Sequence, residues 1–196
     1  MNKGVGAIIL AAGKGTRFHE QKQFVHFIGK PLWRHTYDTA LAVIPKENIV
    51  VVGVDIMGGE TRSKSVLAGL NHLHDIAKVV IIDAARPLLR ADQIQNLIDC
   101  KALSISSVMP VVDTVITTDK QYLDRSKCLR LQSPQAFDFE LLKKAYSTGK
   151  YPDMTDDTRV MFEEYGIAPE FVTGGENLFK VTYPQDLEYL KSFLRR

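Results

Sequence analysis

Short apolar runs alternate with amphipathic segments along the whole chain. Four of these runs, at residues 5–10, 48–54, 78–83 and 106–112, are rich in Val and Ile and lack strict polar alternation. Runs of this kind are typical of strands in a largely parallel sheet whose two faces are both covered by helices. The pattern therefore predicts an α/β fold.

The segments between and after these runs have the spacing of amphipathic helices. Pro31 suits the first position of a helix, Pro45 would end it, and apolar residues recur at helical spacing between them. We expect the core to receive this stripe, which consists of Trp33, Tyr37, Leu41 and Ile44. Further helices are predicted at residues 62–73, 91–103, 139–146, 156–166 and 184–194.

One stretch interrupts the alternation. Between residues 113 and 132, polar residues mix with short apolar runs, and this pattern predicts a protruding hairpin or arm. Elsewhere the sequence has no Gly/Ser-rich linker, repeat or low-complexity tract. A chain of 196 residues is long enough to bury a core, and we expect one domain over residues 1–196.

Composition and charge exclude several classes of protein. With 45% hydrophobic and 24% charged residues, the chain resembles neither a disordered nor a fibrous protein. A formal net charge of +2 gives no reason to expect a nucleic-acid or membrane partner. Cys100 and Cys128 lack the spacing of a zinc site or a redox pair. The apolar run at residues 5–12 is too short for a membrane span and has no signal-peptide cleavage pattern, so we expect a cytoplasmic protein.

The first predicted strand leads into a glycine-rich loop, AAGKGTRF, which is soon followed by Lys22. Gly13 and Gly15 would let backbone N–H groups approach phosphate oxygens. Arg17 and Lys22 would neutralise the charge of those oxygens. The P-loop pattern GxxxxGK[ST] is absent, and the dinucleotide fingerprint needs a third glycine where Phe18 stands. We predict a phosphate-binding loop of another kind, with an ordinary turn and solvated basic side chains as the alternative.

Asp83 is the candidate metal ligand. It ends the predicted strand KVVIID, at the edge where open α/β sheets bind their ligands. A Mg²⁺ ion held mainly by phosphate oxygens needs only one or two protein carboxylates, so a single Asp is sufficient. The alternative is an Asp that caps the following turn. Arg86, three residues later in AARP, is expected to brace this loop.

The order of the motifs carries a more specific signal. The chain contains, in sequence, AAGKGTRF with KQF, GGETRSKSVLAGL, IDAARP, PVVDT, LDRSKCLRLQSPQAF, MTDD and KVTYPQDL. This series covers nearly the whole chain and resembles the successive signatures of the 2-C-methyl-D-erythritol 4-phosphate cytidylyltransferases. The resemblance implies a single Rossmann-like nucleotidyltransferase domain with a short dimerisation arm at about residues 113–132. It also implies Mg²⁺-dependent transfer of CMP from CTP to methylerythritol phosphate, in isoprenoid precursor synthesis, by a homodimer.

The same resemblance assigns roles to individual residues. Catalytic cations would be Arg17, Lys22 and Lys180. Nucleotide-binding residues would be Ala11, Ala12, Gly13, Gly15, Gly59, Glu60, Ser65 and Asp83, of which Asp83 would also bind the metal. The polyol phosphate would meet Thr114, Arg125 and Asp156. Taken singly, these side chains have ordinary alternatives, because Ser and Asp commonly cap helices and most Arg and Lys are solvated.

Several departures from the family pattern leave other functions open. The glycine-rich loop and the arm are shorter than usual, Glu60 stands for Asp, Ile82 for His and Ser133 for Thr. A ribitol-phosphate or other polyol-phosphate cytidylyltransferase is therefore one alternative. A noncatalytic nucleotide-binding regulatory module is another, although retention of the charged set around Arg17 and Lys180 argues against it.

Overall fold

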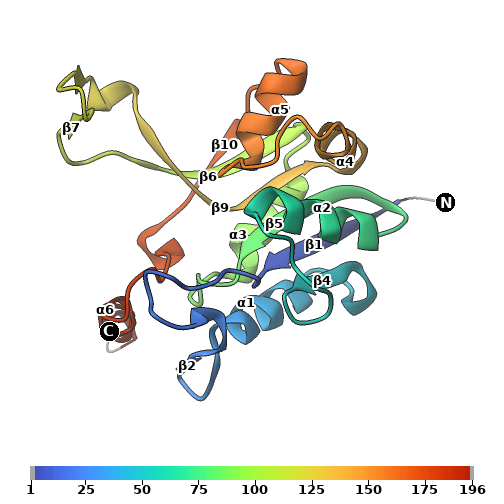
Figure 1. Ribbon diagram of the computed structural model, residues 1–196, viewed down its shortest axis with the longest axis horizontal. Coiled ribbons are helices and arrows are strands. Elements are labelled where there is room, and N and C mark those ends of the chain that lie inside the picture. Colours follow the sequence, from blue (N-terminus) through green and yellow to red (C-terminus); the bar gives the residue numbers. More distant parts are fainter. Residues whose placement is uncertain (1–2, 195–196) are drawn as a thin grey trace.

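The predicted apolar runs form strands of one six-stranded sheet. The computed structural model describes residues 3–194 (Figure 1). The sheet has the order β10-β6-β9-β5-β1-β4, and only β9 runs antiparallel to its neighbours. Its strands are β1 (Gly4–Leu10), β4 (Ile49–Val52), β5 (Ile76–Asp83), β6 (Ser104–Pro110), β9 (Leu129–Asp138) and β10 (Glu170–Thr173). The predicted α/β fold with a mostly parallel sheet is confirmed.

Helices cover both faces of the sheet. One face packs against α1 and α3, and the other packs against α2, α4 and α5. The helices are α1 (Leu32–Leu41), α2 (Arg62–His72), α3 (Ala91–Asp99), α4 (Phe139–Ser147), α5 (Asp157–Tyr165) and α6 (Asp186–Phe193). Among residues 3–194, none of these is long and apolar enough to cross a membrane.

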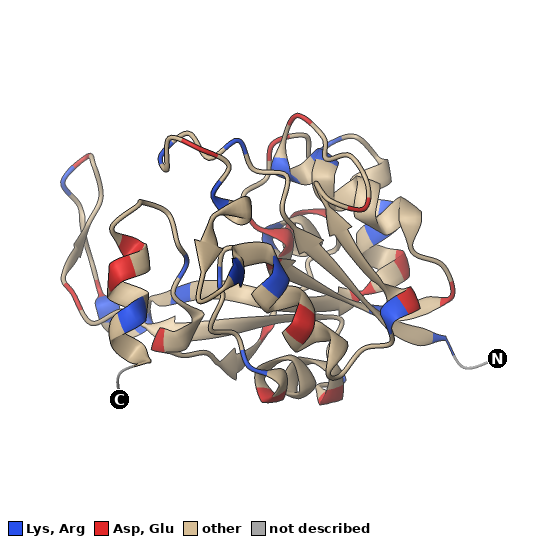
Figure 2. Ribbon diagram, turned by 90° about the horizontal axis from the view of Figure 1, so that it is seen from below, with Lys and Arg blue, Asp and Glu red and all other residues tan. Residues whose placement is uncertain are grey.

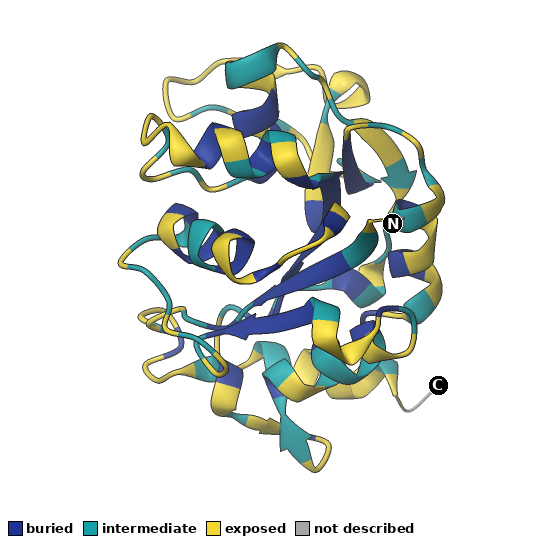
Figure 3. Ribbon diagram, turned by 90° about the vertical axis from the view of Figure 1, so that its right-hand side faces the viewer, coloured by how far each residue is buried: buried dark blue, intermediate teal, exposed yellow. Residues whose placement is uncertain are grey.

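Burial on both faces explains why the strands read as continuous apolar runs. In β1, Ala7 and Ile9 face the α1 side while Ile8 faces the α2 side, and all three are fully buried. Strand side chains alternate between faces, so a strand covered on both sides needs apolar residues at every position. Figure 3 shows the result as a buried sheet with exposed residues on the outer helices. Lys and Arg are interspersed with Asp and Glu (Figure 2).

The structure corrects several predicted boundaries. Strands β4 and β6 are Ile49–Val52 and Ser104–Pro110 instead of 48–54 and 106–112, and α3 ends at Asp99 instead of residue 103. Pro31 is the extended residue before α1, not its first helical residue.

The stripe predicted for α1 is also partly wrong. Leu41 is 41% exposed, whereas Leu32, Thr36 and Ala40 form the fully buried face. The small side chains of Thr36 and Ala40 let the helix approach the sheet closely, so the larger aromatic residues lie at the edge of the contact.

The predicted arm is a protruding hairpin (Figure 1). Its tip pairs β7 (Val115–Ile116) with β8 (Tyr122–Leu123). The predicted range 113–132 runs too far, because β9 begins at Leu129 and pairs with Pro110 at the end of β6. The long β6–β9 ladder thus carries the arm away from the body of the protein.

A third apolar cluster joins the two ends of the chain. Phe18, Phe27 and Leu32 come from the N-terminal part, and Val181 and Leu190 come from the C-terminal part. Phe27 lies in a small hairpin of β2 (His26–Phe27) and β3 (Lys30–Pro31). The cluster brings the segment before α6 next to the loop after β1. The outermost residues of the predicted 1–196 domain, 1–2 and 195–196, lie outside the described residues.

Candidate active site

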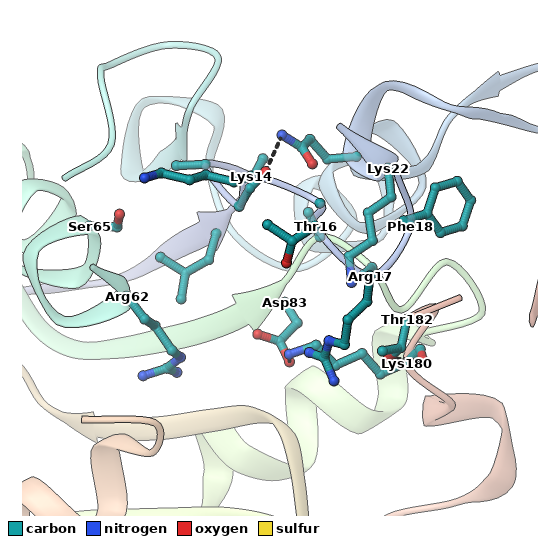
Figure 4. A pocket seen from close by; sticks show the side chains of 18 of the residues that line it. Lys14, Thr16, Arg17, Phe18, Lys22, Arg62, Ser65, Asp83, Lys180 and Thr182 are labelled. Carbon is teal, nitrogen blue, oxygen red and sulfur yellow. Dashed lines mark hydrogen bonds and ion pairs between the residues drawn. The ribbon is translucent and has the colours of Figure 1, made fainter. Parts of the chain in front are cut away.

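A pocket of about 320 Å³ lies at the carboxyl edge of the central strands (Figure 4). Leu10 and Asp83 are register partners at the ends of β1 and β5, so the loops that follow both strands open on the same side. The pocket is lined by the following residues predicted from the sequence: Ala11, Ala12, Gly13, Gly15, Arg17, Lys22, Gly59, Glu60, Ser65, Asp83 and Lys180. One cavity thus brings together all the predicted nucleotide-binding and catalytic residues.

The glycine-rich loop forms one wall. Gly15 has φ +67°, and a Cβ there would lie 1.7 Å from the Glu20 carbonyl oxygen, so only glycine fits. Its carbonyl accepts the Phe18 N–H at 2.8 Å, which closes a tight turn. The Gln23 side-chain amide donates to the Gly13 carbonyl at 3.1 Å. These contacts fix the loop while leaving Gly13 open to the pocket, since a Cβ there would meet no protein atom within 4 Å.

The loop before α2 forms the opposite end. The Gly59 N–H donates to Ser65 Oγ at 3.1 Å, and the Ser65 hydroxyl donates to the Thr61 carbonyl at 3.1 Å. A Cβ on Gly59 would lie 2.2 Å from Lys64 Cβ, so this turn also needs glycine. The Glu60 carboxylate is 83% exposed and pairs with Lys64. Ser65 therefore organises the loop as well as lining the pocket, and Glu60 contributes mainly backbone.

Asp83 is surrounded by positive charge. Its Oδ2 accepts from Lys180 Nζ at 2.9 Å and from Arg86 Nε at 3.3 Å, and its side chain is 12% exposed. Burial alone would raise the pKa of Asp83, but Lys180 and Arg86 outweigh burial and hold that pKa well below its usual range. Arg86 also donates to the Leu178 carbonyl, so the predicted bracing contact is present. Arg17 lines the same pocket as Asp83 (Figure 4).

Lys22 closes the cationic end of the pocket. Its Nζ donates to the Val181 carbonyl at 2.7 Å, next to Lys180 in sequence. Val181 is held in turn, because its N–H donates to the Ala85 carbonyl at 2.9 Å. Burial, followed by the charges of Lys180 and Arg17, lowers the pKa of Lys22 from 10.5 to about 8. A polyanion at this end would relieve the repulsion among the three cations.

The residues predicted for the second substrate do not line this pocket. Thr114 and Arg125 are exposed residues of the arm, and Arg125 donates to the Val112 carbonyl. Asp156 is the N-cap of α5: it accepts the Thr158 N–H at 2.9 Å through Oδ1 and the Gln135 amide at 2.7 Å through Oδ2. Its cap alternative is therefore present, and a substrate contact stays a prediction.

Sequence reasoning missed several lining residues, which include Lys14, Thr16, Thr61, Arg62 and Thr182. Arg62 lies inside the GGETRSKS motif that was already singled out, so that motif was the available signal. A second hollow of about 470 Å³ adjoins the pocket and shares Arg17, Lys180 and Thr182 with it. Arg86 and Arg130 also line this hollow.

The residues present fit a single Mg²⁺ ion that a polyphosphate helps to bind. No cluster of three or more candidate metal ligands occurs within residues 3–194. Asp83 Oδ1, however, has no hydrogen-bond partner among the described residues, while Oδ2 is taken by Lys180 and Arg86. One free carboxylate oxygen beside the glycine-rich loop is what Mg²⁺ would require if phosphates supplied the further ligands.

Comparisons with known proteins give a consistent result. Residues 5–196 match the family model for 2-C-methyl-D-erythritol 4-phosphate cytidylyltransferase. A protein of that name from Haemophilus influenzae is 32% identical over 225 residues, with 100% of this chain and 99% of the relative covered. One from Thermotoga neapolitana is 34% identical over 209 residues, with 93% of each chain covered.

Solved structures share the fold. 4-Diphosphocytidyl-2C-methyl-D-erythritol synthase from Anaerococcus prevotii is 25% identical, with a TM-score of 0.83 over 100% of this chain and 97% of that chain. The bifunctional IspDF from Campylobacter jejuni is 31% identical, with a TM-score of 0.84 over 95% of this chain. This chain spans about half of that longer protein, 54% of its length.

The fold, the pocket at the sheet edge and these similarities define an enzyme of the nucleotidyltransferase class. More specifically, the chain belongs to the 2-C-methyl-D-erythritol 4-phosphate cytidylyltransferase family.

Proposed function

We propose that the protein transfers CMP from CTP to 2-C-methyl-D-erythritol 4-phosphate and releases pyrophosphate, with Mg²⁺, as a step of isoprenoid precursor synthesis in the cytoplasm. The main support is the set of Arg17, Lys22 and Lys180, which line one end of a pocket together with Asp83, while Gly59 and Ser65 build its other end. This arrangement suits a ligand with a polyanionic end and a neutral end, as a nucleoside triphosphate has.

The reaction needs no protein nucleophile. A phosphate monoester is largely dianionic near neutral pH, because its second pKa is about 6. One of its oxygens attacks the α-phosphorus of CTP, the bond from that phosphorus to the bridging oxygen breaks, and pyrophosphate leaves with the electron pair. No proton has to move for the atoms and charges to balance. The pocket offers several cations and the glycine-rich loop to such a reaction, which suits this chemistry.

The chain's residues act by holding charge and position. Lys22 and Lys180 neutralise the negative charge that develops on the oxygens around the α-phosphorus, and Arg17 neutralises the departing pyrophosphate. Asp83 orients Lys180 through their 2.9 Å ion pair. Mg²⁺, held by Asp83 and phosphate oxygens, would supply further charge neutralisation when bound.

The adjoining hollow is the proposed site of the acceptor phosphate. It shares Arg17 and Lys180 with the nucleotide pocket and adds Arg86, so an anion there would face the same charged centre. Thr114 and Arg125 stand on the protruding arm instead, with exposed apolar neighbours such as Tyr122, which is 76% exposed. We propose that the arm packs on a second copy of the chain and offers these two residues to the partner's acceptor site.

The direct test follows pyrophosphate release with Mg²⁺, CTP and either methylerythritol phosphate or ribitol phosphate. We expect turnover with methylerythritol phosphate. Turnover with ribitol phosphate alone would instead support the polyol-phosphate cytidylyltransferase alternative. No pyrophosphate release with either acceptor, combined with measurable CTP binding, would favour the noncatalytic regulatory module.

Gly13→Ala is expected to weaken CTP binding without changing the stability of the fold. A Cβ at Gly13 would meet no protein atom within 4 Å, so the melting temperature should change little. It would point into the space where a phosphate meets the loop, so the KM for CTP should rise about tenfold. Gly149→Ala, in an exposed turn that does not line the pocket, serves as the comparison for KM, and because Gly149 has φ +73° this control should lose some stability. An unchanged KM in Gly13→Ala would contradict phosphate binding at this loop.

Lys22 should set the alkaline limit of activity. Its pKa of about 8 in the free protein means that the charged amine is lost as the pH rises above that value. We expect kcat/KM for CTP to fall about tenfold per pH unit above pH 8, whereas kcat should decline only at higher pH, because the bound polyanion favours protonated lysine. Lys22→Arg should remove this alkaline decline in kcat/KM, since arginine stays charged. If the decline persists in Lys22→Arg, it is caused by another titrating group.

The same pKa affects the stability of the ligand-free protein. Because the pKa of Lys22 is lower in the folded than in the unfolded chain, the unfolded chain binds more protons between about pH 8 and pH 10.5. The contribution of Lys22 to stability therefore becomes more favourable as the pH rises through this window. Melting temperatures of the wild type and Lys22→Met, compared across it, would show the difference.

A further inference from the structure

A buried ion pair outside the catalytic cations forms part of the pocket wall. Arg62 donates to both carboxylate oxygens of Asp157, with Nη1 2.8 Å from Oδ1 and Nη2 2.5 Å from Oδ2. The Asp157 side chain is fully buried and also accepts from the Tyr146 hydroxyl. The Arg62 side chain is 27% exposed and lines the pocket. Asp157 therefore lies in the core, whereas Arg62 lies in the wall of the pocket.

The position of Arg62 places it toward the neutral end of the pocket. Figure 4 shows Arg62 between Ser65 and Asp83, on the side away from Lys22. Burial opposes the charge of Arg62, but Asp157 outweighs burial and raises the pKa of the guanidinium. The pair is neutral overall, so it adds little to phosphate binding. The guanidinium has five N–H donors, and within residues 3–194 only Asp157 accepts from it, so donors remain for uncharged oxygens of a nucleoside.

The pair belongs to a wider set of contacts between two loops. On either side of Arg62, the Thr61 hydroxyl donates to the Pro152 carbonyl at 2.6 Å, and Ser63 Oγ accepts the Met154 N–H at 2.8 Å. Three consecutive residues at the start of α2, Thr61 to Ser63, are thus attached to residues 152–157. This attachment sets where the start of α2 stands relative to α5.

The N-terminus of α5 is also connected, through β9, to the part of the pocket that contains Asp83. Asp156, next to Asp157, accepts from the Gln135 amide at 2.7 Å. Two residues before Gln135 on β9, Ser133 Oγ accepts the Asp83 N–H at 2.8 Å. The two consecutive carboxylates therefore connect the nucleoside end of the pocket, through Arg62, with the metal-ligand candidate, through β9.

We propose that Arg62 contacts the nucleoside half of the nucleotide and that Asp157 is the positioning residue that holds it there. The inference rests on the proposed function in that the ligand is taken to be CTP. A fully buried carboxylate is costly without a partner, so the pair fixes the guanidinium in one orientation. A fixed donor binds an uncharged oxygen better than a mobile one, because less conformational entropy is lost on binding.

The test uses titration calorimetry to measure the dissociation constants of two ligands, CTP and inorganic pyrophosphate, in the absence of an acceptor. In Arg62→Lys and Asp157→Asn, the dissociation constant for CTP should rise at least about tenfold, because the oriented donors are lost. The dissociation constant for pyrophosphate should stay within about twofold of the wild type, since pyrophosphate reaches only the cationic end. Tyr146→Phe, which keeps both charges, should have a smaller effect of the same kind.

Lys78→Met is the control for lost stability. Lys78 lies toward the opposite end of β5 from Asp83 and donates to the Ile98 carbonyl in the last turn of α3 at 3.0 Å, so its loss should lower the melting temperature without changing either dissociation constant. If affinities for CTP and pyrophosphate fall together in the Arg62 and Asp157 variants, or neither falls, the proposal is wrong. Tyr146→Phe keeps the test decisive if Asp157→Asn does not fold. Since no turnover is needed, an inactive wild type would overturn the proposed function and leave this inference standing.

Discussion

Lys180→Met is expected to lower kcat about a hundred- to a thousandfold, which is the usual cost of removing one preorganised group that stabilises transition-state charge. Lys180 Nζ lies 2.9 Å from Asp83 Oδ2 and the side chain is 41% exposed, so in the free protein its charge is paired but still accessible. When a nucleotide binds, the ammonium group can turn from Asp83 to the phosphate. Methionine keeps an unbranched side chain of similar length and removes the ammonium group, and Lys180 is partly exposed, so the fold should survive.

Steady-state kinetics of pyrophosphate release would measure this effect, with Lys191→Met as the matched control. Lys191 lies on α6 near Lys180 in sequence and pairs with Glu188 at the surface, so its replacement should leave kcat unchanged. Lys180→Arg should recover part of the rate because it restores the charge. A kcat within threefold of the wild type in Lys180→Met would remove Lys180 from the catalytic set.

Asp83→Asn is the second large effect that we expect. The substitution is nearly isosteric and keeps the Asp83 N–H bond to Ser133, yet it leaves Lys180 and Arg86 without their common counter-charge. It also replaces the negatively charged carboxylate proposed to bind Mg²⁺ by a neutral amide. We expect kcat to fall at least about a hundredfold and the Mg²⁺ concentration for half-maximal rate to rise about tenfold.

A Mg²⁺ titration at saturating CTP separates the two causes. A lower kcat with an unchanged Mg²⁺ requirement would mean that Asp83 acts by orienting Lys180 alone. Asp99→Asn, at the exposed end of α3, is the control for the loss of one negative charge, and it should match the wild type in both quantities. Full activity of Asp83→Asn would exclude both roles.

The strands that the sequence predicts well are those with uniform burial. Residues 5–10 and 78–83 are apolar at nearly every position because helices cover both faces, and the runs are visible without any alignment. Strand β9 was not predicted, since its residues Gln132, Ser133 and Gln135 are polar and yet buried. They are buried because they hold other parts of the site. A strand with such functional contacts loses the apolar pattern that identifies strands.

The site could be predicted where a residue belongs to a local motif. Arg17, Lys22 and Lys180 each lie in a short recognisable segment, and the fold brings all three to one pocket. The pairing of Arg62 could not be predicted, because its partner Asp157 is 95 residues away and neither residue forms a local pattern with the other. Pairing over such distances depends on the packing of α4 against both α2 and α5, which only the structure gives.

The contact between Lys22 and the Val181 carbonyl joins residues 159 positions apart. The ribosome makes a chain from its N-terminus, so the glycine-rich loop emerges long before the segment that carries Lys180. Until that segment arrives, Phe18 and Phe27 lack their C-terminal partners Val181 and Leu190, and the cationic end of the pocket cannot assemble. The pocket proposed for a triphosphate is therefore completed only after the segment around Lys180 has been synthesised and docks against the glycine-rich loop.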